Sequence, residues 1–229
     1  MTITRTVRLI WRNPYITDGL IAHWDGLWNI GPDKHNPTST VWTDLVNGTS
    51  VALNGQTFSE NSLIHNRVKS TIKFYPAGLE QLSTRSYEFI FRILESECVD
   101  CNFIAANTTN NGFKHILINT NRIGIRIHNA VFGIDLKDST GSTGCQNFAT
   151  TSSATINNGD VSLYTSGKFG ARDATLRSWN DTYFTFPNTS SIQGSNIYCE
   201  LCAIRIYNRI LSATEIATNY AIDKSRFHL

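Results

Sequence analysis

Near the end of the chain, one segment predicts a strand followed directly by a helix. It reads Ile197-Tyr198-Cys199-Glu200-Leu201-Cys202-Ala203-Ile204-Arg205-Ile206-Tyr207-Asn208-Arg209-Ile210-Leu211-Ser212-Ala213-Thr214-Glu215-Ile216. Residues 197–207 predict the strand, with Cys202 as an ordinary core position on the face of Ile204 and Ile206. Residues three apart on a strand point to opposite faces, so Cys199 and Cys202 cannot hold one metal ion without a bulge. We interpret Cys202 as a small buried apolar residue.

The helix follows from a capping box at Ser212-Ala213-Thr214-Glu215. In this motif the Ser212 hydroxyl accepts from the Glu215 amide, and the Glu215 carboxylate reaches back to the Ser212 amide. Leu211 and Ile216 stand at the positions of a hydrophobic staple. We expect a short C-terminal helix that packs through Ile216 and Tyr220 and ends near Ser225.

Working outward, alternation of polar and apolar residues recurs through most of the chain. In residues 122–128 three isoleucines share one face, which is typical of a half-buried strand. Residues 87–94 carry apolar side chains on both faces, which predicts a strand covered on both sides. Further strands are expected at 20–25, 71–75, 115–119, 131–136, 160–165 and 183–186. Many short strands between turn clusters such as Asn111-Gly112 predict an all-β antiparallel sandwich.

The composition excludes several classes of function. The 229 residues are 41% hydrophobic and 17% charged, with a formal net charge of +2, so neither disorder nor nucleic-acid binding is indicated. No apolar run is long enough for a membrane span, and residues 1–11 alternate and do not resemble a signal peptide. Five cysteines cannot all pair internally, so synthesis in a reducing cytoplasm is the simpler interpretation.

The first residues differ from the rest of the chain. Residues 1–17 predict a strand-like arm before a domain at residues 18–229. The arm could add a strand to an edge of the sandwich, or it could pair with another subunit or a larger assembly, including a homo-oligomer.

Both ends of the domain carry a recognisable pattern. Residues 18–26, 42–48 and 53–55 resemble the opening of laminin-G-like, concanavalin A-like lectin/glucanase domains, and residues 203–212 with Glu215-Ile216 and Asn219-Tyr220 resemble their final strand and helix. The resemblance implies a concanavalin A-like jelly-roll sandwich of two antiparallel sheets with a short C-terminal helix. It also implies that Trp24 and Trp42 belong to the core.

Such domains are common in proteins of gut bacteria and their phages. By analogy, a chain without an export signal and with an arm is expected to be a phage virion component, such as a fibre or capsid decoration. Its location would be the virion or the extracellular space, and its partners a bacterial surface polysaccharide and, through residues 1–17, a virion or other assembly protein. A purely structural virion protein is the alternative.

Enzymatic and metal chemistry find little support in the sequence. A hydrolase of this fold needs a strand with alternating carboxylates, and the nearest stretch, with Glu95 and Glu97, lies at a strand end, so no catalytic residues and no resident cofactor are expected. The pairs Cys98/Cys101 and Cys199/Cys202 could instead bind zinc, or Cys98, Cys101 and Cys145 could form a disulfide. Calcium, which the resemblance implies, could use Asp25, Asp33 and Asp44.

Sugar binding requires an exposed aromatic ring beside hydrogen-bonding side chains. Each candidate could instead be a structural anchor or a solvated side chain. They are Trp28, Trp179, Asn180, Asp181, Tyr183, Arg126 and His128. We predict a non-catalytic carbohydrate-binding or adhesion module, and rank a glycan hydrolase below it.

Overall fold

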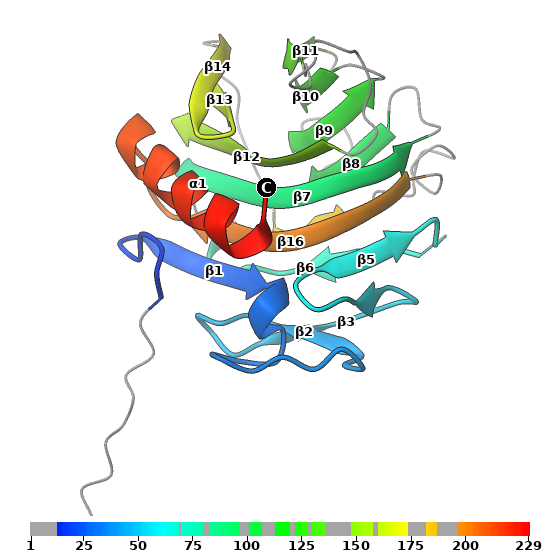
Figure 1. The fold of residues 1–229 in the computed structure, drawn as a ribbon. Helices are drawn as coiled ribbons and strands as arrows, with labels where there is room; N and C mark the ends of the chain where they lie inside the picture. The colour runs from blue at the N-terminus through cyan, green and yellow to red at the C-terminus, as the bar shows by residue number, and fades with distance from the viewer. Residues whose placement is uncertain are drawn as a thin grey trace, which may run out of the picture.

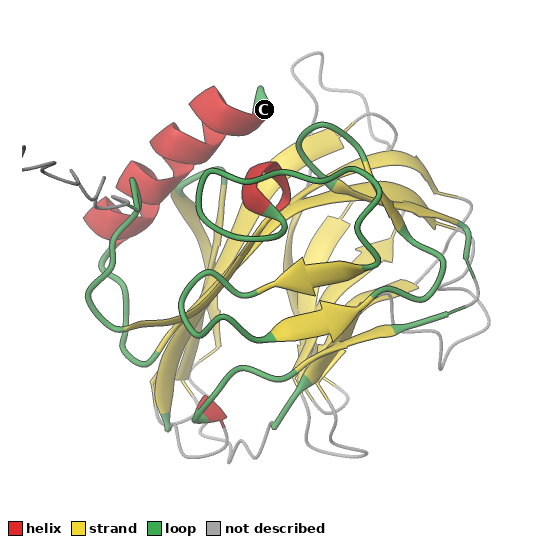
Figure 2. Cartoon of the chain, turned by 90° about the horizontal axis from the view of Figure 1, so that it is seen from below, coloured by secondary structure: helices red, strands yellow, loops and turns green. Residues whose placement is uncertain are grey.

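The computed structural model shows two antiparallel sheets packed face to face, with one helix on the outside (Figures 1 and 2). It describes residues 13–68, 70–79, 83–96, 101–106, 113–119, 122–127, 130–135, 148–157, 160–173, 182–186 and 197–229. This confirms the expected all-β sandwich with a C-terminal helix. Within these residues, no helix is long and apolar enough to cross a membrane.

The larger sheet carries the helix. Its described strands run in the order β14 (Lys168–Asp173), β13 (Asp160–Thr165), β12 (Phe148–Asn157), β7 (Thr84–Ser96), β16 (Ile197–Tyr207), β5 (Leu63–Asn66) and β4 (Thr57–Phe58), and β1 (Leu20–Asp25) also pairs with β16. The strands at 20–25, 160–165 and 197–207 are confirmed to the residue. Strands β12 and β14 were not predicted.

The smaller sheet closes the other side of the sandwich. Its described strands run in the order β11 (Ala130–Asp135), β10 (Arg122–Ile127), β9 (Phe113–Asn119), β8 (Cys101–Ala106), β15 (Phe184–Phe186) and β6 (Ile72–Phe74). A separate hairpin of β2 (Val41–Thr43) and β3 (Ser50–Ala52) lies beside them, and the 3-10 turn η1 (Gly26–Trp28) follows β1.

The core lies between the sheets and is rich in aromatic rings. Trp24 and Trp42 are fully buried there, as the resemblance implies. Trp24 packs edge-on against Phe74 at 5.0 Å, and Phe74 stacks on Phe184 at the same distance, so rings from both sheets interlock. Phe89 and its neighbours on β7 face this core.

Strand β7 is covered on both sides, as predicted. Ile90 points away from the sheet core and packs with Cys202, Ala203 and Phe227 beneath the helix. The placement of Cys202 on the face of Ile204 was wrong, because the register shifts between Leu201 and Ala203 and the bulge turns Cys202 toward the helix. Cys202 is nevertheless a buried free thiol, and so is Cys199 on the core side.

The helix α1 (Ala213–Phe227) begins at the predicted capping box, with Ser212 as its N-cap. Leu211 and Ile216 share one small cluster with Tyr207, as expected for a hydrophobic staple. The helix runs two residues beyond the expected end. Its buried positions are Ile216, Asn219, Asp223 and Phe227, so the face that packs is partly polar, and Tyr220 lies beside it half-buried.

Residues 13–17 of the expected arm lie against the domain. Tyr15 is only 4% exposed, and the Ile16 amide donates to Asn219 Oδ1 on the helix at 3.1 Å. The end of the arm is therefore anchored by contacts from the helix, while residues 1–12 lie outside the described part.

Candidate functional site

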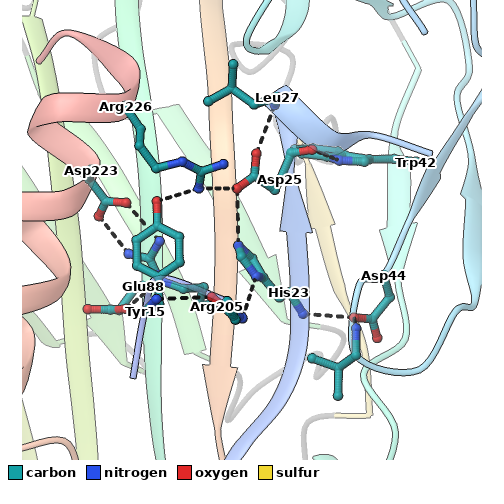
Figure 3. A network of polar contacts seen from close by, with 12 residues as sticks. Tyr15, His23, Asp25, Leu27, Trp42, Asp44, Glu88, Arg205, Asp223 and Arg226 are labelled. Carbon is teal, nitrogen blue, oxygen red and sulfur yellow. Dashed lines mark hydrogen bonds and ion pairs between the residues drawn. The ribbon is translucent and has the colours of Figure 1, made fainter. Parts of the chain in front are cut away.

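Beneath the helix lies a buried polar cluster, which we call the Arg205 network: Tyr15, Glu88, Arg205, Tyr207, Asn219 and Asp223. Figure 3 shows Tyr15, Glu88, Arg205 and Asp223 of this network. Arg205 is fully buried on β16. Its Nη1 and Nη2 donate to the two oxygens of Asp223 at 2.8 and 2.6 Å, and its Nε donates to Glu88 Oε2 at 2.7 Å. The Tyr15 ring covers the guanidinium, with Cζ 3.8 Å from the ring centroid.

The remaining polar groups of this network are also partnered. Asn219 Nδ2 donates to Glu88 Oε2 at 2.8 Å and to the Tyr207 hydroxyl at 3.0 Å. Burial raises the pKa of Glu88, against the opposing effect of the Arg205 charge. Burial also disfavours the charged form of Arg205, but Asp223 and Glu88 outweigh it and hold the pKa of Arg205 above its usual range.

A second buried cluster surrounds Asp25 at the end of β1 (Figure 3). Arg226 Nη1 donates to Asp25 Oδ2 at 2.6 Å and to the Tyr15 hydroxyl at 2.9 Å, and His23 Nε2 lies 3.5 Å from the same carboxylate. Burial would raise the pKa of Asp25, but His23 and Arg226 bring it below its usual value. Burial lowers the pKa of His23, which keeps the imidazole neutral.

These two clusters join the N-terminal segment, three strands and the helix. Arg205, Glu88, Asp223 and Asp25 are all fully buried, so their charges meet one another and not a ligand. The arrangement holds the helix on the sheet, and a substrate has no access to it in this conformation.

Two of the three aspartates proposed as calcium ligands already have protein partners. Asp25 accepts a hydrogen bond from Arg226, and Asp44 accepts hydrogen bonds from the amides of His23 and Val46, each at 2.9 Å. Asp33 is exposed on a separate turn. In the described part of the chain, no three His, Cys, Asp or Glu side chains gather to hold a metal ion. Calcium binding stays a prediction.

Among the described residues, a surface hollow with the dimensions of a small-molecule site lies on the outer face of the larger sheet. We call it the sheet-face hollow, and it has a volume of about 390 Å³, within the usual range of small-molecule sites. Its lining residues are Thr155 and Asn157 on β12, Asp160, Ser162 and Tyr164 on β13, Phe169 and Arg172 on β14, and Ile210 before the helix.

Strand register places these side chains on one face. Thr155 lies opposite Ser162, and Ser162 opposite Arg172, so the three form a row across the sheet. Tyr164 pairs with Phe169 after a one-residue bulge. The opposite face of these strands is apolar, with Ala154, Ile156, Val161 and Leu163 fully buried in the core.

The helix supports the hairpin that forms one wall. Strands β13 and β14 meet in a turn with positive φ at Ser166 and Gly167. A Cβ atom at Gly167 would lie 3.0 Å from the Tyr220 ring, so this turn packs closely on α1, and the close contact together with the positive φ favours glycine there. Tyr164 packs against the cluster of Leu211 and Ile216 at the start of the helix.

Phe169 is the exposed ring of the hollow. It is 59% exposed, and Tyr75, at 56%, is the other large hydrophobic side chain above half exposure among the described residues. Tyr164 meets the Phe169 ring edge to face, with centroids 5.6 Å apart. One side of Phe169 is thus held in place while much of its surface remains open to solvent.

The charged groups of the hollow form one ion pair. Arg172 Nε lies 3.0 Å from Asp160 Oδ1, and Arg172 Nη2 lies 2.5 Å from Asp160 Oδ2. The hydrogen bond from Arg172 holds the pKa of Asp160 below its usual value. The other lining side chains, from Thr155 to Ile210, are uncharged.

Of the predicted sugar-binding residues, the structure describes the side chains of Trp28 and Tyr183. The Trp28 ring lies half-buried beneath Arg226, whose Cζ is 4.2 Å from the ring centroid, so one ring face is already covered. Tyr183 lies near the smaller sheet, 5.1 Å from the Tyr75 ring, with Lys73 Nζ 5.2 Å from its own centroid. Arg126 lies on β10, and the structure describes its backbone but not its side chain. Trp179, Asn180, Asp181 and His128 lie outside the described residues.

None of the sheet-face hollow residues was singled out from the sequence. Two of its three strands, β12 and β14, were missed. Strand β12 is rich in Thr and Ser, and on β14 the exposed Phe169 breaks the alternation of apolar and polar residues. One usable signal was present. Tyr164 and Phe169 flank a Ser166-Gly167 turn, and a hairpin with that turn places both rings side by side.

Comparisons with known proteins establish the fold of the chain. Family models and curated proteins give no match. Among solved structures, Trypanosoma rangeli sialidase in complex with sialic acid is similar, with a TM-score of 0.68 at 14% identity over 90% of this chain and 33% of that one. The binding domain of botulinum neurotoxin serotype G has a TM-score of 0.65 at 16% identity, over 90% of this chain and 51% of the other.

The binding domain of botulinum neurotoxin serotype D is similar to the same degree, with a TM-score of 0.66 at 18% identity, over 90% of this chain and 52% of the other. This chain therefore spans a third to about half of these solved chains. At such identities the likeness shows the two-sheet β-sandwich, in agreement with the strand topology.

Proposed function

We propose that this chain is a non-catalytic carbohydrate-binding module, and that the sheet-face hollow is its sugar site. The observation that carries the proposal is the open ring of Phe169 beside hydroxyl and amide side chains on a rigid sheet face. A pyranose has an apolar face that can lie on an aromatic ring, and hydroxyls that both donate and accept hydrogen bonds. Ser162, Asn157 and Tyr164 offer the matching groups.

The size and charge of the hollow support the same interpretation. A volume of about 390 Å³ lies within the range of sites that bind small ligands. A stable protein interface is a different kind of surface, which buries about 800 Å² on each partner. Glycoside hydrolysis generally needs two carboxylates, and the described lining of the hollow contains one, Asp160, which accepts hydrogen bonds from Arg172. Binding without hydrolysis is therefore favoured. The solved neighbours, which include a sialidase and neurotoxin binding domains, are compatible with this class of ligand.

The test is a glycan array probed with the full chain, followed by calorimetry with the best oligosaccharide. Phe169→Ala should weaken binding at least about tenfold, which is roughly 1.4 kcal/mol. Because Phe169 is more than half exposed, the fold should remain intact. Tyr75→Ala removes an equally exposed ring from the Tyr183 region, and Val46→Ala is a control in a distant loop.

These variants separate the two candidate sites. Loss of binding in Phe169→Ala alone supports the sheet-face hollow. Loss in Tyr75→Ala alone would place the sugar site beside Tyr183, as the sequence analysis predicts. If no glycan binds the native chain, the proposal fails.

An assembly role for the arm belongs to the same proposal, and the resemblance alone supports the narrower idea of a phage virion. Tyr15 is part of the fold, so the informative truncation removes residues 1–12 and keeps 13–17. The truncated chain should keep its thermal stability but lose self-association or incorporation into a particle, measured by light scattering and co-purification. Unchanged assembly would refute the role.

A further inference from the structure

The charge arrangement of the sheet-face hollow bears on which sugars it accepts, a selectivity that rests on the proposed sugar-binding function. Arg172 is 58% exposed and Asp160 is 23% exposed, so both reach the ligand side of the hollow. Asp160 accepts hydrogen bonds from Nε and Nη2 of Arg172, so Nη1 takes no part in the pair. The pair has no net charge, and neither do the other lining side chains.

A neutral pyranose can use this pair without breaking it. Each sugar hydroxyl carries one donor and two acceptor sites, so neighbouring hydroxyls can donate to Asp160 and accept from Arg172 at the same time. Hydrogen bonds to charged groups are the stronger kind, and here the two charged groups already contact each other. The adjacent Phe169 ring supplies the apolar contact for the sugar ring.

An acidic sugar meets a different situation. Its carboxylate would have to compete with Asp160 for Arg172 or lie close to the Asp160 carboxylate, and like charges at such a distance repel. None of the remaining lining residues, Thr155, Asn157, Ser162, Tyr164, Phe169 and Ile210, offers a compensating cation.

We propose that the sheet-face hollow selects neutral pyranoses over uronic and sialic acids, and that Asp160 is the residue that excludes the acidic sugars. Asp160 acts through charge and by engaging Arg172. Removing its charge while keeping its shape should then release Arg172 for a carboxylate ligand.

The test compares ligands that differ only in charge. Galacto-oligosaccharides and galacturonic acid oligomers share ring stereochemistry and differ at C6, as do gluco- and glucurono-oligomers. The full chain is titrated with both members of each pair at two salt concentrations, alongside Asp160→Asn, Arg172→Gln and Phe169→Ala. The native chain should prefer a neutral member by at least tenfold. Asp160→Asn should raise affinity for its acidic partner at least tenfold, with salt sensitivity, and Arg172→Gln should not.

The possible outcomes distinguish a failure of the selectivity from a failure of the proposed function. Stronger binding of an acidic oligomer by the native chain, lost in Phe169→Ala, overturns the selectivity and leaves the carbohydrate site standing. An Asp160→Asn variant that folds, by circular dichroism, and gains no acidic binding also overturns the assigned role of Asp160. If the native chain binds none of the oligomers and no arrayed glycan, the proposed function fails and the selectivity fails with it.

Discussion

Replacing Arg205 should test whether the buried polar network holds the helix on the sandwich. In Arg205→Met the carboxylates of Glu88 and Asp223 stay buried but lose the guanidinium that contacts them at 2.6–2.8 Å. Removing one partner of a buried ion pair costs about 3–5 kcal/mol, because the other charge is left uncompensated. Here two carboxylates are left, so we expect a loss at or above the upper end of that range at pH 7.

Urea unfolding followed by tryptophan fluorescence measures this loss. The matched control is Arg209→Met. Arg209 also forms a bidentate ion pair, with Glu215, but its side chain is 26% exposed, whereas Arg205 is fully buried. Pairs of that kind contribute about 1 kcal/mol or less. The triple variant Arg205→Met, Glu88→Gln, Asp223→Asn should regain much of the stability, because it no longer buries unpaired charge.

The pH dependence has a definite sign. Burial already raises the pKa of Glu88, and without Arg205 it must rise further. A carboxyl group whose pKa is higher in the folded state than in the unfolded state costs stability at high pH, and that cost shrinks as the pH falls. The difference between Arg205→Met and the native chain should therefore be smaller at pH 5 than at pH 7. A loss no larger than that of Arg209→Met, or no recovery in the triple variant, would refute the reasoning.

Three further predictions concern single buried sites. Burial lowers the pKa of His65 from 6.5 to about 4, so stability should fall as the pH drops from 6.5 toward 4, by up to about 3 kcal/mol from this group. His65→Leu should remove that part of the pH dependence in unfolding titrations, while the contribution of the buried His23, whose pKa is also lowered by burial, remains. A Cβ atom at Gly26 would lie 2.4 Å from the Asn61 carbonyl oxygen, so Gly26→Ala should lower the free energy of unfolding, measured in urea, by about 2–3 kcal/mol. Gly48→Ala has open space around the Cβ but a positive φ, and should lower it by about 1 kcal/mol. Equal losses in the two variants would contradict the packing argument. Burial raises the pKa of the Cys199 and Cys202 thiols, so peptide mapping should find both unalkylated in the native chain and modified after unfolding.

Much of the architecture follows from local pattern. Strands β1, β13 and β16 match their predicted bounds, because apolar side chains at alternate positions mark a buried face whatever the partner strand is. The start of the helix was equally clear, since the capping box at Ser212 and Glu215 satisfies backbone amides within four residues. Strand β12 escaped because small and hydroxyl side chains alternate there with little contrast.

The polar residues show where local pattern stops being informative. Glu88 lies on the face of β7 that also carries Ile90, and no neighbouring residue in the sequence indicates a partner for its carboxylate, yet it is fully buried. Its burial depends on Arg205 from β16, which also pairs with Asp223, and on Asn219 from the helix. These partners reach Glu88 only after the chain has folded. Sequence separations above 100 residues hide such a network from any local pattern.

The sequence alone determined that this chain is an antiparallel β-sandwich with a capped terminal helix, because strand periodicity and capping act between near neighbours. The tertiary structure decided where a ligand could bind. Phe169, Arg172 and Ser162 become neighbours through strand register, a bulge and a turn held by the helix. It also decided that Trp28, a candidate for stacking on a sugar, contacts Arg226, because the end of the helix packs against the end of the first strand.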